Sequence, residues 1–243
     1  MKTLKITSTL LTLFLSLTVQ SQTWFDIGLK GGAGGGFLLN KTVNSDSRFD
    51  VLPQLNYFYG GKVGVNFGEK IGIDLDIDYG KYAYGFSQSK VLGQDQNKTY
   101  AYKMMYNAIS FMPTFRYTNE ASYLELGFQY SILKNQTVSD GINSGFLLDR
   151  LNKSSKQLVF GFGGHMVGND VIALMMGLRF SYALSDLTAY EYSSTHFPFT
   201  NYSDITNHTP VNRLNTQLIL ELNYSLGYLV RASCGRRTAF LSF

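Results

Sequence analysis

The sequence predicts an all-β fold, an antiparallel up-and-down barrel of eight strands, from two observations. Apolar and polar residues alternate with a period of two over eight segments, as in strands whose two faces meet different surroundings. The links between these segments are alternately long and short along the chain. Transmembrane barrels of outer membranes have this form, with short periplasmic turns and long extracellular loops.

The ends of each alternating run delimit the expected strands. The clearest run is 71–79, where isoleucine, leucine and tyrosine alternate with Gly72 and three aspartates. The strands are expected at 23–38, 52–67, 71–86, 103–117, 122–133, 157–167, 171–185 and 213–229. The links between them are then 39–51, 68–70, 87–102, 118–121, 134–156, 168–170 and 186–212.

The first 21 residues differ in kind from the rest. Two lysines precede an apolar run of only eight residues over 10–17, and small or β-branched residues follow it. This order is typical of a secretory signal peptide, and the run is far shorter than the roughly 20 residues of a spanning helix. We expect cleavage before Gln22, which gives a signal peptide over 1–21 and one barrel domain over 22–243.

Composition narrows the class of protein further. The formal charge of +4 falls to +2 without the two lysines of the signal, and no basic run is interleaved with aromatic residues, so nucleic acid is not an expected partner. After the signal no stretch of 18 apolar residues remains, so strands must make any membrane span. The single cysteine, Cys234, excludes an internal disulfide.

Periodicity alone does not say which strand face is inside. A soluble barrel of the lipocalin type would turn its apolar face inward, around a ligand. The alternating link lengths, the export signal and aromatic residues near both strand ends favour the opposite sense, with the apolar face toward outer-membrane lipid. These aromatic residues are Trp24, Phe25, Phe67, Phe115, Tyr117 and Tyr228 toward the short turns, and Tyr57, Tyr59, Tyr82, Tyr84, Tyr130 and Tyr182 toward the long loops.

In the membrane sense the inner face carries charges of both signs, which need partners in a narrow lumen. Eight strands enclose an interior that side chains are able to fill, so we expect a packed, salt-bridged lumen, with a narrow porin as the alternative. Glycines on the same face make room for the long side chains. The expected lumen charge network is Asp26, Lys30, Lys62, Asp74, Asp76, Asp78, Arg116, Glu125, His165, Arg179 and Glu221.

Several segments resemble a known family. They are residues 28–32 (Gly-Leu-Lys-Gly-Gly), 59–65 (Tyr-Gly-Gly-Lys-Val-Gly-Val), 108–117 (Ala-Ile-Ser-Phe-Met-Pro-Thr-Phe-Arg-Tyr) and 123–127 (Tyr-Leu-Glu-Leu-Gly). In these the chain is similar to the small outer-membrane β-barrel proteins of Bacteroidota, often called PorT-like or porin-family proteins. The resemblance rests on features of the barrel rather than on catalytic residues, and it implies a family whose members are generally of unknown function, with one branch in the type IX secretion and gliding apparatus. Residues 231–237 depart from the family pattern, in which the last strand ends on a terminal aromatic residue.

We expect no catalytic, cofactor or metal site. The glycine run 31–36 has the spacing of a dinucleotide fingerprint, but no helix follows it to bind a phosphate. A lipid A-modifying enzyme or a protease would need rigidly placed catalytic groups at the outer rim. His165 falls at the short-turn end, whereas His196 and His208 lie in a loop without a third metal ligand at motif spacing.

The last long link, 186–212, uses 27 positions where three or four suffice to reverse a strand. Its aromatic density suits a contact surface, although the same side chains would also pack over the barrel mouth or on the membrane interface. The expected partners are outer-membrane lipid and lipopolysaccharide, the barrel-assembly machinery during biogenesis, and an extracellular or secretion-system protein. The candidate contact residues are Tyr190, Tyr192, His196, Phe197, Phe199 and Tyr202.

Overall fold

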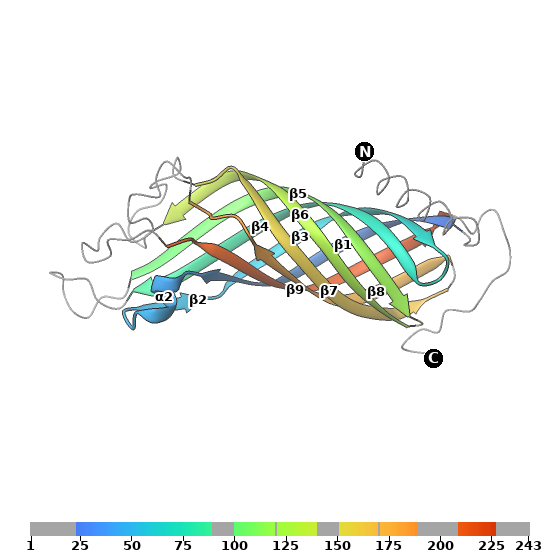
Figure 1. The fold of residues 1–243 in the computed structure, drawn as a ribbon, viewed down its shortest axis with the longest axis horizontal. Coiled ribbons are helices and arrows are strands. Elements are labelled where there is room, and N and C mark those ends of the chain that lie inside the picture. The colour runs from blue at the N-terminus through green and yellow to red at the C-terminus, as the bar shows by residue number, and fades with distance from the viewer. Residues whose placement is uncertain are drawn as a thin grey trace, which may run out of the picture.

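The computed structural model describes residues 23–88, 100–119, 121–139, 151–169, 171–188 and 209–226, which form one closed antiparallel barrel. The pairing of β4 with β5 completes the ring, and all the strands are inclined to its long axis (Figure 1). The eight predicted strands are confirmed. Their bounds are β1 (Thr23–Leu39), β3 (Gln54–Phe67), β4 (Ile71–Gln88), β5 (Tyr100–Asn119), β6 (Ser122–Ser139), β7 (Ser154–Gly168), β8 (Ile172–Ala183) and β9 (Asn212–Ser225).

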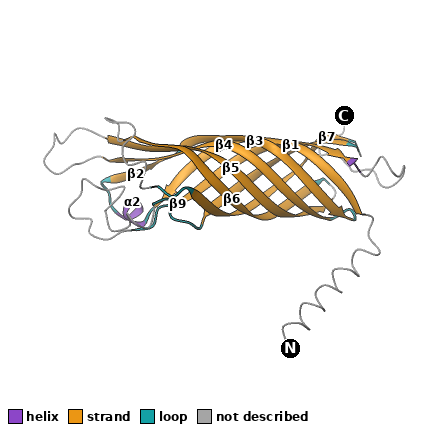
Figure 2. Ribbon diagram, turned by 90° about the horizontal axis from the view of Figure 1, so that it is seen from above, coloured by secondary structure: helices purple, strands orange, loops and turns teal. Residues whose placement is uncertain are grey.

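The connections at the two ends of the barrel differ as predicted. Short turns join β3 to β4, β5 to β6 and β7 to β8, and Gly68 in the first of them has a φ of 67°. At the other end the strands run further than the sequence pattern suggested, because β4 continues to Gln88 and β6 to Ser139. Figure 2 shows these strand ends projecting beyond the body of the barrel.

The first long link contains regular structure that the alternating pattern did not predict. It contains a short helix, α2 (Lys41–Ser45), and a ninth strand, β2 (Phe49–Leu52), which pairs with the loop end of β4. Asn40 begins the helix, since its Oδ1 accepts a hydrogen bond from the Val43 amide at 3.2 Å. Pro53, which has no amide hydrogen, separates β2 from β3, so the strand predicted from residue 52 begins instead at Gln54 and Leu52 belongs to β2.

The polar face of each strand points into the barrel and the apolar face points outward, as predicted for a membrane barrel. On β4 the side chains of Ile73 and Leu75 are exposed by 46% and 44%, whereas Asp74 and Asp76 are exposed by 1% and 0%. The polar face therefore lines the lumen and the apolar face points outward. A lipocalin-type barrel has the reverse arrangement and is excluded.

Three of the aromatic residues expected at the membrane interfaces lie on the lumen face instead. Tyr82 and Tyr84 are buried inside the barrel, because they share the face of β4 that carries the aspartates. Trp24 is half-buried and donates a hydrogen bond from Nε1 to the Gly68 carbonyl at 3.2 Å. Phe67 is half-buried and Tyr228 lies outside the described residues. The other aromatic residues expected at the interfaces, which are exposed, are Phe25, Phe115 and Tyr117 toward the short turns and Tyr57, Tyr59, Tyr130 and Tyr182 toward the long loops.

Two local irregularities mark the seam between β5 and β6. Pro113 has no amide hydrogen, and the pairing of these strands is interrupted between Phe111↔Tyr130 and Thr114↔Gly127. Nearer the loops the register shifts between Met105 and Asn107, opposite Asn135 with its φ of 49°.

Candidate functional site in the barrel lumen

Ten charged side chains form one connected group of ion pairs across the middle of the lumen, which we call the central network. It draws on seven of the eight ring strands, and every member is buried. Its cations are Lys30, Lys62, Arg116 and Arg179, and its carboxylates are Asp26, Asp74, Asp76, Asp78, Glu125 and Glu221.

Glu221 on β9 connects three of the four cations. Its carboxylate accepts hydrogen bonds from Arg116 at 2.7 and 2.9 Å and from Lys62 at 2.9 Å. Lys30 lies 3.2 Å from the other oxygen. Asn223, on the same strand face, also donates to Glu221 at 2.6 Å. The carboxylate is thus held by groups from four strands, which fixes its position in the lumen.

The two arginines join the opposite walls of the barrel. Arg179 donates to Glu125 at 2.9 Å and to Asp76 at 3.0 Å. Arg116 contacts Glu125 at 3.1 Å and Asp74 at 3.1 Å, in addition to Glu221. A guanidinium has several donors in a fixed plane, so each arginine is able to bind more than one carboxylate at once.

The central network has six carboxylates for four cations. One oxygen of each of Asp26, Asp74, Asp76 and Asp78 is buried without a hydrogen-bond partner among the described residues. When all the groups are ionised, the middle of the lumen therefore has an excess of negative charge.

Glycines give the charged side chains their space, as predicted. A Cβ atom at Gly64 would meet the Oδ1 atoms of Asp26 and Asp74, and one at Gly161 would lie 2.6 Å from the Glu125 carboxylate. These glycines stand beside the acidic residues in the strand pairing, Gly64 opposite Asp26 and Asp74, and Gly161 opposite Glu125.

Toward the long loops, the lumen is filled by an aromatic layer around one further cation. Arg213 is fully buried and donates to the Tyr106 hydroxyl at 3.1 Å and to Ser155 Oγ at 2.9 Å. The Tyr106 ring stacks on Tyr82 and Tyr84, with centroids 5.6 and 5.8 Å away. Arg213 was missed from the sequence, although it shares its strand face with Asn215, Gln217 and Glu221.

Above this layer an apolar group closes the barrel mouth, and we call it the mouth cluster. Val43 of α2 and Phe49 of β2 contribute to it, and these two elements lie at the loop end of the barrel (Figure 1). Asn40 holds its edge by donating from Nδ2 to the Thr209 hydroxyl at 2.8 Å and to the Pro210 carbonyl at 3.2 Å. The mouth cluster consists of Leu38, Val43, Phe49, Phe86, Met104, Val138, Leu151, Leu187 and Val211.

Asp46 and Arg48 form an ion pair just beyond the end of α2. The guanidinium of Arg48 donates to both carboxylate oxygens of Asp46, at 2.5 Å for the shortest contact. This hydrogen bonding lowers the pKa of Asp46 below its ordinary value.

At the short-turn end, Tyr123 packs under the central network, with the Arg116 guanidinium 4.5 Å from its ring centroid. His165 is buried at this end, beside Met175 in the strand pairing. It shares the lumen face with the central network, and Met175 pairs in turn with Glu221 on the next strand.

The remaining sequence-based candidates fall in different places. The glycine run 31–36 lies within β1 and no helix follows it closely enough to form a phosphate site. The loop residues from Tyr190 to Tyr202, and with them His196 and His208, lie outside the described residues. Within the described ranges no group of histidine, cysteine or acidic side chains has the arrangement of a metal site.

The helical content gives no membrane span. No helix in the described part of the chain has the length and apolar character to cross a bilayer.

Comparison with known proteins agrees with this architecture. Residues 20–189 match the family described as outer membrane protein beta-barrel domain. The chain belongs to this family. It is therefore a protein of the outer membrane, surrounded by lipid, with its short turns on the periplasmic side and its long loops outside.

Solved structures similar to the chain are also outer-membrane proteins. OprG from Pseudomonas aeruginosa is 11% identical, with a TM-score of 0.42, over 85% of this chain and 98% of that one. The attachment invasion locus protein Ail of Yersinia pestis, in complex with a heparin analogue, is 10% identical, with a TM-score of 0.37, over 83% and 99%. AlkL is 12% identical, with a TM-score of 0.42, over 88% and 94%. No curated protein sequence matches the chain significantly.

Proposed function

We propose that this protein is a non-enzymatic, closed outer-membrane barrel whose lumen is structural and whose activity lies in binding a partner at its extracellular end. The observation that carries the proposal is the filling of the lumen. The central network crosses its middle, the Arg213 layer lies above, and the mouth cluster covers the outer opening. A barrel closed in this way stabilises the envelope without providing a route for solutes.

Planar bilayer recordings test whether the lumen is closed. We expect the purified wild-type barrel to give no stable single-channel steps, because ion pairs and packed side chains occupy the lumen. Replacement of Arg213 and Tyr84 together by alanine should leave the barrel closed, because the central network still crosses the lumen. Steps of nanosiemens size in the wild type would contradict the proposal.

A narrow porin is the second candidate, and the excess of carboxylates over cations in the central network favours it. A water-filled lumen with this charge would select small cations over anions. A reversal potential measured across a salt gradient distinguishes the two, since a closed barrel gives no selective current at all.

The proposed partner is an extracellular or secretion-system protein. One observation supports this proposal: the link that contains Tyr190 to Tyr202 is long and aromatic. The resemblance to PorT-like proteins points to the type IX secretion and gliding apparatus as the class of partner. Co-purification from crosslinked cells, compared between the wild type and a chain with 190–207 replaced by a Gly/Ser link, tests it. Equal recovery of partners from the two would contradict it.

A further inference from the structure

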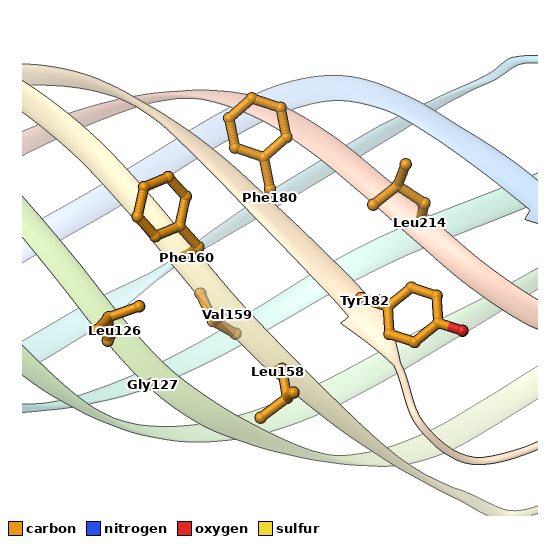
Figure 3. A pocket seen from close by; sticks show the side chains of 8 residues that line it. All are labelled: Leu126, Gly127, Leu158, Val159, Phe160, Phe180, Tyr182 and Leu214. Carbon is orange, nitrogen blue, oxygen red and sulfur yellow. The ribbon is translucent and has the colours of Figure 1, made fainter.

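The outer face of the barrel has an apolar hollow of about 370 Å³ over β6, β7, β8 and β9 (Figure 3). This volume falls in the range of roughly 300–1,000 Å³ that ligand pockets occupy. Its floor is the pair Gly127 and Val159, whose side-chain positions face the lumen. Its rim consists of Leu126, Leu158, Phe160, Phe180, Tyr182 and Leu214.

The rim selects an apolar occupant. Adjacent strands pair Leu126 with Phe160 and Leu158 with Tyr182, so outward side chains surround the hollow. The only polar atom they offer is the Tyr182 hydroxyl, which already accepts a hydrogen bond from Asn212 at 3.0 Å. A hydrocarbon chain fits such a surface better than any group that needs hydrogen bonds.

The hollow lies in the half of the barrel nearer the long loops. Tyr182 and Tyr130 are exposed there, at the level where aromatic residues meet the membrane interface. Phe160 and Phe180 lie deeper, toward the short turns. The hollow therefore opens to the outer leaflet, whose lipid in an outer membrane is lipopolysaccharide.

Three exposed lysines gather above the hollow at the loop ends of β6 and β7. Lys156 is two residues from Leu158 on the same strand face, about 7 Å along the strand, and opposite Tyr130. Lys153 precedes β7, and its carbonyl accepts a hydrogen bond from the Leu133 amide, next to Lys134, at 2.8 Å. Lysine is a common ligand of phosphate in proteins. This end of the hollow thus suits an anionic headgroup.

We propose that the hollow and these three lysines form a binding site for lipid A, with one acyl chain in the hollow and a sugar phosphate at the lysines. A second copy of this chain would fill the hollow but leave the lysines without an anion. A phospholipid would satisfy both parts, but it offers one phosphate on a flexible headgroup. Lipid A holds phosphates on a rigid disaccharide with several chains below it, which matches lysines spread over two strands.

Native mass spectrometry of the full-length protein in detergent tests the site, with purified lipid A or phosphatidylglycerol as the added probe. We expect one lipid A to stay bound to the wild type in preference to phosphatidylglycerol. The variant K134Q/K153Q/K156Q should bind lipid A about tenfold more weakly, the effect of losing one charge-assisted hydrogen bond. Leu126→Trp, which fills the hollow from its rim, should weaken binding without removing any charge.

Matched controls lie elsewhere on the barrel. K41Q/K70Q/K81Q removes three exposed lysines away from the hollow, and Leu75→Trp enlarges an outward leucine of β4. Both should retain lipid A, and all the variants must keep the folded gel mobility. The proposal is overturned if the controls lose lipid A as the test variants do. It also fails if phosphatidylglycerol binds equally well, or if Leu126→Trp breaks a dimer and leaves lipid binding intact.

Discussion

Gly64 has no side chain, and this leaves the space that two aspartates occupy. A Cβ atom there would meet the Oδ1 atoms of Asp26 and Asp74, which have no room to retreat in a filled lumen. We expect Gly64→Ala to lower the free energy of unfolding by about 1–3 kcal/mol, the usual cost of overpacking. Unfolding by urea in lipid vesicles, followed by the fluorescence of Trp24, measures it.

Gly61 provides the control for this substitution on the same strand. Its Cβ atom would point outward, with the nearest atom, the Gly28 carbonyl oxygen, 3.5 Å away. Gly61→Ala should therefore change the unfolding midpoint little. Equal effects at the two positions would mean that backbone freedom, and not the lumen carboxylates, makes Gly64 necessary.

Arg116 has three carboxylate partners in the central network, Asp74, Glu125 and Glu221. Arg116→Leu leaves Asp74, Glu125 and Glu221 with fewer counter-charges in a buried place. We expect a loss of about 3–5 kcal/mol in unfolding free energy, as for other buried pairs with one partner removed. Leu126→Val on the lipid face is the control and should cost far less. A loss for Arg116→Leu no greater than that of the control would show that the lumen is hydrated enough to screen its charges.

The choice of ion-pair partners could not be read from the sequence. Alternation with a period of two predicts which charges face the lumen, and all eleven predicted lumen residues are indeed buried. Partner choice depends on strand register and on side-chain reach, which place Arg116 next to Glu221 across 105 residues of chain. The same information was needed to place Arg213 beside Tyr106 and Ser155.

At the scale of elements, the residues that follow segment 190–207 are hydrogen-bonded to the barrel. Thr209 and Pro210 bind Asn40, and the Val211 amide donates to Asp186 Oδ1 at 3.0 Å. We expect replacement of 190–207 by a short Gly/Ser link to leave folding and membrane insertion intact, because these contacts remain.

The same replacement should reproduce whatever phenotype a full deletion shows. Alanine at His165, His196 or His208 should not reproduce it, and a histidine variant that does so while folded would favour an enzyme.

The elements that the sequence pattern missed share a physical cause. Beyond the bilayer a strand meets water on its outer face, so the contrast between apolar and polar positions that marks a strand fades there. This is why β6 extends past its predicted end at 133. It is also why the alternating pattern did not predict β2, which pairs with the loop end of β4. Tyr82 and Tyr84 have a different cause. They were expected at the membrane interface because they are aromatic, but the alternation that continues through β4 places them on the lumen face.

At the scale of the whole molecule, closed strand pairing predicts resistance to detergent. Within the ring, the strands on both sides satisfy the backbone groups of each strand, so unfolding has to break many hydrogen bonds together. We expect the mature protein to begin at Gln22 and to sit in the outer-membrane fraction, with a gel mobility that changes on boiling. Amino-terminal sequencing and gels of heated and unheated samples check this. A soluble periplasmic protein with one band in both samples would contradict it.

The pairing of β1 with β9 sets a condition on how the cell makes this protein. These strands are the first and last of the ring, so the edge of β1 that β9 covers stays open until synthesis has reached residue 225. Every shorter nascent chain has two open strand edges, and open edges pair readily with those of other chains. The ring therefore closes only once β9 has been made, so we expect shorter chains to aggregate unless their edges are protected.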